Sequence, residues 1–212
     1  MASFRPFSLT YVVYQENDNL GKLLALFSLA PVFIVVSLTT LIASRRDLRT
    51  ISLMLGVLIN EVINYILKTA LQEARPSISN VDFIPKYGMP SNHSQFMGFL
   101  AMNVTLWAVK HWKISTLWKI LSILGIWALT FIVGVSRIYL LYHTFNQVFV
   151  GIVAGCVFGY IWHVIIENVF LEYFQWIQQL PLMKMLYVRD TTRTDNLLAL
   201  EYNLAKSSSK SW

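Results

Sequence analysis

The chain has 212 residues, of which 56% are hydrophobic and 13% are charged, and its mean hydropathy is +0.53. Soluble domains contain about 45 to 50% apolar and about 25% charged residues, so the composition excludes an ordinary soluble protein and indicates a membrane protein. The net charge of +6 fits the Lys/Arg bias that sets membrane topology, and we expect no nucleic-acid partner. The single cysteine, Cys156, excludes a disulfide framework.

Apolar stretches predict the membrane spans in chain order. The first is the run of 22 uncharged residues between Lys22 and Arg45, which is long enough to cross a hydrocarbon core of about 30 Å. Four further spans are predicted over residues 50–67, 94–109, 120–136 and 144–166. The sequence therefore predicts an all-α, polytopic helical bundle of about five spans, formed by residues 1–212 as a single integral-membrane domain.

The C-terminal part carries two further patterns. Three glycines at four-residue spacing, Gly151, Gly155 and Gly159, predict that the last span packs closely against another helix. The following segment, "YFQWIQQLPLMKMLYV", is apolar but interrupted by polar residues, which predicts an interfacial helix and leaves a sixth span as the alternative. Residues 189–212 are expected to form a loose polar tail.

Positive charges predict the orientation of the bundle. The loops "SRRDLRT" and "KHWKISTLWK" are rich in Arg and Lys and should face the cytoplasm, so five spans place the N-terminus on the opposite side. The two remaining loops, residues 72–93 and 137–143, then share the non-cytoplasmic face.

These two loops and the helix ends beside them hold Lys68, Arg75, His93, Arg137 and His143. Each has an ordinary explanation alone, such as a snorkelling lysine, an arginine that ends a helix or an interfacial side chain. Together they would place three cations and two imidazoles on one membrane face, where like charges repel unless an anion lies between them. A phosphate group is the expected anion, because Arg binds its oxygens in bidentate fashion.

The stretch "PSNH" adds a helix N-terminus to this face. Ser91 is expected to cap the third span, and the free backbone amides after it can bind an anion. Capping alone is the simpler function for one serine. Two histidines suggest ester cleavage, in which one neutral imidazole attacks phosphorus and a protonated one donates to the leaving oxygen, with a bell-shaped pH profile. The sequence has no metal-ligand spacing, so we expect no metal or other cofactor.

Three motifs resemble those of the type 2 phosphatidic acid phosphatase superfamily. "KTALQEARP" fits K-x6-R-P, "PSNH" fits P-S-G-H with one change, and "SRIYLLYH" fits S-R-x5-H. The wider stretches "KYGMPSNHSQFM", "SRIYLLYHT" and "YVRDT" are similar to the eukaryotic dolichyl diphosphatases.

The resemblance implies a metal-independent phosphatase site at the lumenal surface of the endoplasmic reticulum membrane. It implies that His143 is the nucleophile, which forms a phosphohistidine, and that His93 is the acid and base. The implied phosphate-binding residues are Lys68, Arg75, Ser91 and Arg137 with the amide of Asn92, and Pro76 is a supporting residue of the first motif. The implied substrate is dolichyl diphosphate, which is trimmed to the monophosphate for protein N-glycosylation, and no obligate protein partner is expected beyond the membrane lipids.

The sequence departs from the superfamily pattern at two positions. Asn92 replaces the glycine of P-S-G-H, so the loop must accommodate a side chain. Gln147 stands where the superfamily usually has an aspartate, and an amide can fix a tautomer but cannot stabilise an imidazolium by its charge. Glu61, which shares a helix face with Lys68, is expected either to supply a carboxylate or to be a buried structural partner.

Two other functions remain open at this stage. A phosphate cradle does not specify the lipid tail, so phosphatidate, a sphingoid phosphate or another polyprenyl diphosphate is an alternative substrate. A transporter or a non-catalytic lipid-phosphate binder is a second alternative, for which the intramembrane Glu61 is the best feature.

Overall fold

The computed structural model describes residues 12, 14–15, 17–76, 87–192 and 197–209. These residues form helices and no β-strand. The elements are α1 (Asn19–Ser28), α2 (Ala30–Arg45), α3 (Leu48–Leu71), α4 (Asn92–His111), α5 (Thr116–Tyr139), α6 (Phe145–Ile165), the π-helix η2 (Ile166–Phe170), α7 (Leu171–Ile177), α8 (Pro181–Met185) and α9 (Leu197–Ser209). The predicted all-α fold class is confirmed.

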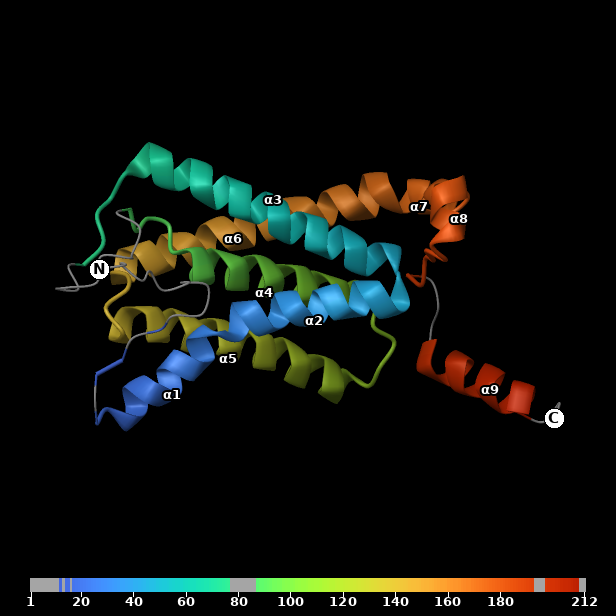
Figure 1. Ribbon diagram of the computed structural model, residues 1–212, viewed down its shortest axis with the longest axis horizontal. Coiled ribbons are helices and arrows are strands. Elements are labelled where there is room, and N and C mark those ends of the chain that lie inside the picture. Colours follow the sequence, from blue (N-terminus) through green and yellow to red (C-terminus); the bar gives the residue numbers. More distant parts are fainter. Residues whose placement is uncertain (1–11, 13, 16, 77–86, 193–196, 210–212) are drawn as a thin grey trace, which may run out of the picture.

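Four helical stretches of the described chain are long and apolar enough to cross a membrane: 19–45, 48–71, 116–139 and 145–177. Helix α4 has 20 residues, about 30 Å at 1.5 Å per residue, and it runs through the middle of the bundle between α2, α3, α5 and α6 (Figure 1). The protein is therefore a multi-pass membrane protein, and the expected number of about five spans agrees with this arrangement.

The first span is broken into two helices. Leu29 separates α1 from α2, and Pro31 lies in the first turn of α2. A proline lacks an amide hydrogen and its ring collides with the preceding turn, so a continuous helix cannot pass through this position. The break redirects α1, which packs against α5 through Ala25, Leu140 and Tyr142.

The last span is longer than predicted. Helix α6 continues without interruption through η2 and α7 to Ile177. The segment that was expected to be an interfacial helix is therefore divided, because its first part extends the span and its second part contains the short helix α8. Among the described residues after α7, no further helix is long enough to span a membrane.

The glycine pattern of α6 permits its contact with α4. A Cβ atom on Gly151 would lie 2.7 Å from the carbonyl oxygen of Ser91, and one on Gly159 would lie 2.8 Å from that of Phe99. A Cβ on Gly155 would be closer still to the Gln95 carbonyl oxygen. The backbones of the two helices thus meet directly, which confirms the predicted close packing of this face.

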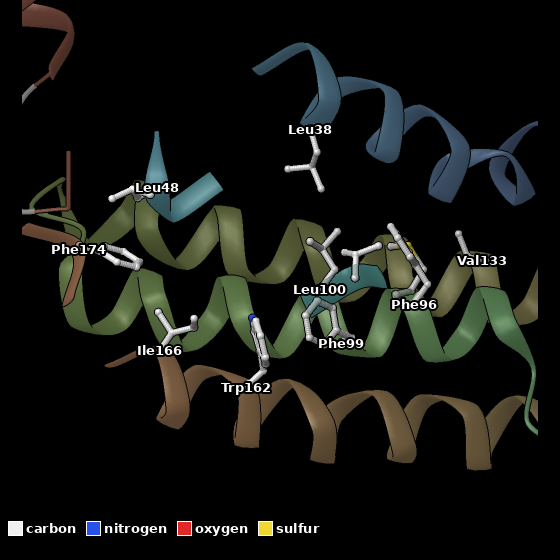
Figure 2. Close-up of a cluster of buried hydrophobic side chains, with 11 residues drawn as sticks. Leu38, Leu48, Phe96, Phe99, Leu100, Val133, Trp162, Ile166 and Phe174 are labelled. Carbon is white, nitrogen blue, oxygen red and sulfur yellow. The ribbon is translucent and has the colours of Figure 1, made fainter. Parts of the chain in front are cut away.

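Aromatic and aliphatic side chains fill the space around α4. Figure 2 shows Phe96 and Phe99 on α4, with Trp162 reaching toward Phe99 from α6 and Val133 facing the same cluster from α5. The Phe99 and Phe158 rings stack with their centroids 5.4 Å apart. This core fixes the relative positions of the helices whose ends carry the candidate active site.

The opposite end of the bundle is held by charged groups. The Glu167 carboxylate, whose side chain is 3% exposed, contacts Arg49 at 2.8 Å, Lys110 at 2.8 Å and His111 at 2.9 Å. These residues connect η2 with the start of α3 and the end of α4. A carboxylate buried so deeply is stable only because several cations compensate it.

The chain after α8 returns to the same end of the bundle. The Asp47 carboxylate caps α3 by accepting from the Thr50 amide at 3.1 Å, and it also accepts from the amide and hydroxyl of Thr191 at 3.0 and 2.7 Å. Farther along, Glu201 of α9 contacts Arg189 at 2.9 Å. Of residues 189–212, for which a loose tail was expected, the described start is thus bonded to the bundle and residues 197–209 form α9.

Candidate active site

The two unusual loops meet at one end of the bundle, as expected. The C-terminal ends of α3 and α5 and the N-terminal ends of α4 and α6 all lie at the left of Figure 1. The Arg/Lys-rich connections after α2 and α4 lie at the other end. Residues 77–86 of the first loop lie outside the described residues.

The end of α5 positions Arg137 and His143. The helix stops at Tyr139, and the backbone amides of Tyr142 and His143 both donate to the Arg137 carbonyl, at 3.0 and 3.1 Å. Leu141 adopts a left-handed conformation, with φ of 59°, which lets the chain turn back. The Arg137 guanidinium lies over the Tyr142 ring, 3.9 Å from its centroid, so the S-R-x5-H motif forms one compact turn.

Arg75 connects the first loop with this turn. Its Nε donates to the Tyr87 carbonyl at 3.2 Å, and its Nη1 donates to the Tyr142 carbonyl at 3.4 Å. Lys68 belongs to the last turn of α3, and Pro76 follows Arg75 directly in the chain. Two stretches that are distant in sequence, one with Lys68 and Arg75 and the other with Arg137, thus bring three cations to one place.

The same three cations act electrostatically on both histidines. His93 and His143 each lie in the field of Arg137, Lys68 and Arg75. Within the described part of the chain, no ion pair joins any of the three cations to a carboxylate. The structure therefore gathers the five charged or titratable residues that the motifs predict.

Arg137 is the most buried of these cations. It is 5% exposed, and its Nε has no hydrogen-bond partner among the described residues. A buried guanidinium nitrogen without a partner is costly unless a ligand completes its hydrogen bonds. The arrangement is suited to an anion that presents several oxygen acceptors.

His143 is held in its neutral form. It is 2% exposed, and burial, followed by the positive charges of Arg75 and Arg137, lowers its pKa from an ordinary 6.5 to about 2. Burial also lowers the pKa of Arg75, which nevertheless remains a cation. A neutral imidazole retains one nitrogen lone pair, which a nucleophile requires.

Gln147 determines which nitrogen of His143 keeps that lone pair. Its Oε1 lies 3.1 Å from His143 Nδ1 and also accepts from the Thr144 amide at 3.3 Å, while its Nε2 donates to Glu73 Oε1 at 2.9 Å and to the Ala74 carbonyl at 2.8 Å. With both amide hydrogens engaged elsewhere, Oε1 faces the imidazole, so Nδ1 carries the proton and Nε2 is free.

The N-terminus of α4 forms another wall of the site. Ser91 stands at the N-cap position, but among the described residues no side chain caps this helix. The Ser91 hydroxyl instead accepts from the Ser94 hydroxyl at 3.0 Å, and its amide donates to the Gln147 carbonyl at 3.0 Å. The predicted N-cap position of Ser91 is thus confirmed, but its hydroxyl makes no capping bond, and the first-turn amides of α4 remain uncapped for an anion.

Asn92 and Glu61 are partners across helices. Asn92 Nδ2 donates to Glu61 Oε2 at 2.9 Å, so the side chain that replaces the motif glycine points toward α3. Behind it, Gln95 is fully buried. Its Oε1 accepts a hydrogen bond from Asn64 Nδ2 at 2.8 Å, and its Nε2 donates to Asn60 Oδ1 at 3.0 Å. The sequence left Asn60, Asn64 or another helix open as the structural partner of Glu61, and the structure shows a residue of another helix, α4.

Sequence patterns did not reveal Glu73, Gln95 or Tyr142 as parts of this region. Glu73 lies between the lysine and arginine of the first motif. This position was the only feature of the sequence that could have indicated that Glu73 lies near the site. The described residues contain no group of three or more His, Cys, Asp or Glu side chains that could hold a metal ion. The catalytic roles of the site residues remain predictions.

Comparisons with known proteins show which family the sequence matches. The family model of the PAP2 superfamily matches residues 49–170, which include all three motifs. Dolichyldiphosphatase 1 of Homo sapiens is 37% identical over 217 residues, covering 99% of this chain and 91% of the relative. Dolichyldiphosphatase 1 of Dictyostelium discoideum is 42% identical over 198 residues, covering 92% of this chain and 86% of the relative.

A solved structure supports the fold. The crystal structure of a transmembrane PAP2-type phosphatidylglycerolphosphate phosphatase from Bacillus subtilis superposes with a TM-score of 0.62 at 18% identity, covering 74% of this chain and 80% of that one. The family match extends over more than half of the sequence, and relatives above 30% identity align with nearly all of it. This chain therefore belongs to the PAP2 superfamily.

Proposed function

We propose that this protein is a lipid phosphatase that hydrolyses dolichyl diphosphate to dolichyl monophosphate and phosphate. The observation that carries the proposal is the convergence of Lys68, Arg75 and Arg137 on two histidines, with no ion pair to an acid among the described residues. A phosphoryl group supplies the missing negative charge, and its oxygens match the guanidinium donors. The names of the relatives support dolichyl diphosphate as the substrate.

The first half of the reaction transfers the phosphoryl group to the protein. The Nε2 lone pair of His143 attacks the terminal phosphorus, and the bond from phosphorus to the bridging oxygen breaks. His93 carries a proton once the anionic phosphoryl group offsets the charges of the three cations, and it gives this proton to that oxygen, so dolichyl monophosphate leaves and a phosphohistidine remains. Lys68, Arg75, Arg137 and the uncapped amides of α4 bind the phosphoryl oxygens and stabilise the charge in the transition state.

The second half restores the protein. Neutral His93 accepts a proton from a water molecule as that water attacks the phosphorus, and the bond to His143 breaks. Phosphate leaves, while His93 is protonated and His143 is neutral again. The three cations take the place that metal ions hold in other phosphatases, so this cycle uses no cofactor.

The proposed location is the membrane of the endoplasmic reticulum, with the site facing the lumen. The Arg/Lys-rich connections at the end of the bundle away from the site support this orientation through the positive-inside rule. A lumenal site meets the dolichyl diphosphate that protein N-glycosylation releases there, and it returns the monophosphate for reuse as the lipid carrier.

Phosphate release from the purified protein tests the proposal. With EDTA present, the wild type should release phosphate from dolichyl diphosphate faster than from dolichyl monophosphate or phosphatidate, and His143→Ala should release none. Preference for phosphatidate or a sphingoid phosphate would keep the chemistry and change the substrate. Equal behaviour of the wild type and His143→Ala would favour a lipid-phosphate binder or transporter over an enzyme.

A further inference from the structure

We infer that Glu73 is a positioning residue for the proposed nucleophile: its carboxylate acts on His143 through the side-chain amide of Gln147. The inference rests on the proposed function, because it assigns a role within that reaction. It also explains how the chain can operate without the aspartate that its superfamily usually has at the position of Gln147.

The geometry forms a continuous chain of hydrogen bonds. His143 Nδ1 lies 3.1 Å from Gln147 Oε1, and Gln147 Nε2 lies 2.9 Å from Glu73 Oε1. Gln147 is fully buried and His143 is 2% exposed, so water does not compete with the bond between them, whereas the bond to Glu73 is partly buried. In such surroundings, hydrogen bonds in a chain polarise one another.

The orientation of the amide has no satisfactory alternative. If Gln147 were flipped, its NH2 group would face the Thr144 amide hydrogen, and its oxygen would face the Ala74 carbonyl and the Glu73 carboxylate. Every one of these contacts would then join two donors or two acceptors. The carboxylate of Glu73 thus helps to fix the amide, and the amide fixes the Nδ1–H tautomer of His143.

Charge gives Glu73 a second effect. When Nε2 bonds to phosphorus, the imidazole becomes positively charged in the field of Arg75, Arg137 and Lys68. The neutral amide of Gln147 alone compensates little of this positive charge. The Glu73 carboxylate accepts a hydrogen bond from Gln147 Nε2 and thereby polarises the amide. The negative charge on Gln147 Oε1 increases, which stabilises the imidazolium that forms.

The backbone around Glu73 holds this carboxylate in place. The Glu73 carbonyl accepts from the Gly88 amide at 2.8 Å, and Ala74 pairs with Tyr87 in an isolated antiparallel bridge. A Cβ on Gly88 would lie 2.5 Å from Gln147 Oε1 and 2.8 Å from Arg75 Cγ. The loop therefore needs a glycine there, so that it can close over the bonded amide.

Glu73→Gln tests the inference because glutamine can accept the same hydrogen bond without carrying a charge. Rapid-quench labelling with terminally labelled dolichyl diphosphate should show phosphohistidine forming about 10 to 100 times more slowly, the range seen for outer partners of metal-bound histidines. KM should change little, since Glu73 bonds to Gln147 and is not one of the proposed phosphate-binding residues. The matched control is Glu172→Gln, an exposed position, which should form the label at the wild-type rate.

A second substitution separates charge from structure. Gln147→Glu in the Glu73→Gln background places a carboxylate directly on His143 and should recover at least half of the lost rate on a logarithmic scale. A double variant no faster than Glu73→Gln, or a Glu73→Gln protein with the wild-type labelling rate, would overturn the inference.

A spectroscopic measurement keeps the test independent of turnover. In 15N-histidine-labelled protein in micelles, the His143 Nδ1 proton, assigned by its loss in His143→Ala, should move upfield in Glu73→Gln because its hydrogen bond weakens. An unchanged resonance would contradict the relay even if the protein proved inactive on every lipid. Inactivity of the wild type on all lipid phosphates would refute the proposed function instead.

Discussion

Replacing Gly155 by alanine tests whether direct backbone contact between α4 and α6 sets the geometry of the site. The added Cβ would lie 2.8 Å from the Phe99 amide nitrogen, which is 0.6 Å short of the 3.4 Å at which ordinary contact begins, and it would be closer still to the Gln95 carbonyl oxygen. Both neighbours are backbone atoms, so no side-chain rotation can relieve the collision. The two helices must therefore separate.

The expected cost follows from this separation. Overpacking a close-packed interior costs about 1 to 3 kcal/mol, and each kcal/mol shifts the unfolding midpoint of a chain of this size by about 2 to 4 °C. Ser91 lies about one turn before Gln95 on α4, and its amide donates to the Gln147 carbonyl of α6 at 3.0 Å. A shift of about 0.6 Å would lengthen this hydrogen bond beyond the usual range, so phosphate release should fall as well.

Thermal unfolding in detergent micelles and phosphate release measure these two effects. The control is Gly125→Ala on α5, where an added Cβ meets nothing within 4 Å and where alanine should stabilise the helix by about 0.5 to 1 kcal/mol. A Gly155→Ala protein that melts at or above the wild-type temperature, with full turnover, would refute the reasoning that these backbones touch.

Three further predictions concern charged groups. Glu167→Gln should lower stability by about 1.5 to 3 kcal/mol, because it removes the charge of a buried carboxylate that accepts a hydrogen bond from Arg49, whereas Glu172→Gln at an exposed site should unfold at the wild-type midpoint. Asp47→Ala removes the cap of α3 and the anchor of the C-terminal segment, so limited proteolysis should cut that segment faster while turnover persists; equal cutting rates would contradict the anchor. Arg75→Gln removes a charge that lowers the pKa of His143, so this pKa should rise toward 6.5 and the acid limb of kcat/KM should move to higher pH than in the wild type; an unmoved or lower limb would contradict this sign.

The sequence predicted the bundle and the gathering of the motif residues because both depend on strong local signals. An uncharged run long enough to cross a membrane has few alternative structures, and loops that connect alternate spans must share a face. The sequence alone therefore placed Lys68, Arg75 and His143 on one face. The three glycines of α6 likewise predicted a contact, although not that α4 was the partner.

The details that the sequence did not reveal depend on long-range contacts. Gln147 and Glu73 are 74 residues apart, and nothing in either local pattern indicates that an amide and a carboxylate will meet behind His143. For the same reason, the sequence did not determine which residue is the partner of Glu61. The break at Pro31 is different, because a proline inside a predicted helix is a visible local signal that the span prediction did not use.

Helix α4 carries His93 yet is not among the helices of the described chain that are apolar enough to enter a membrane on their own. Its buried face includes Ser94, Gln95 and Asn103, and Asn103 donates to the Gly159 carbonyl of α6 at 3.1 Å. During synthesis this helix emerges before α6, so its hydrogen bond to that helix forms only after α6 has been made. Stable packing of α4 and completion of the proposed active site should therefore occur together, once α6 is in place.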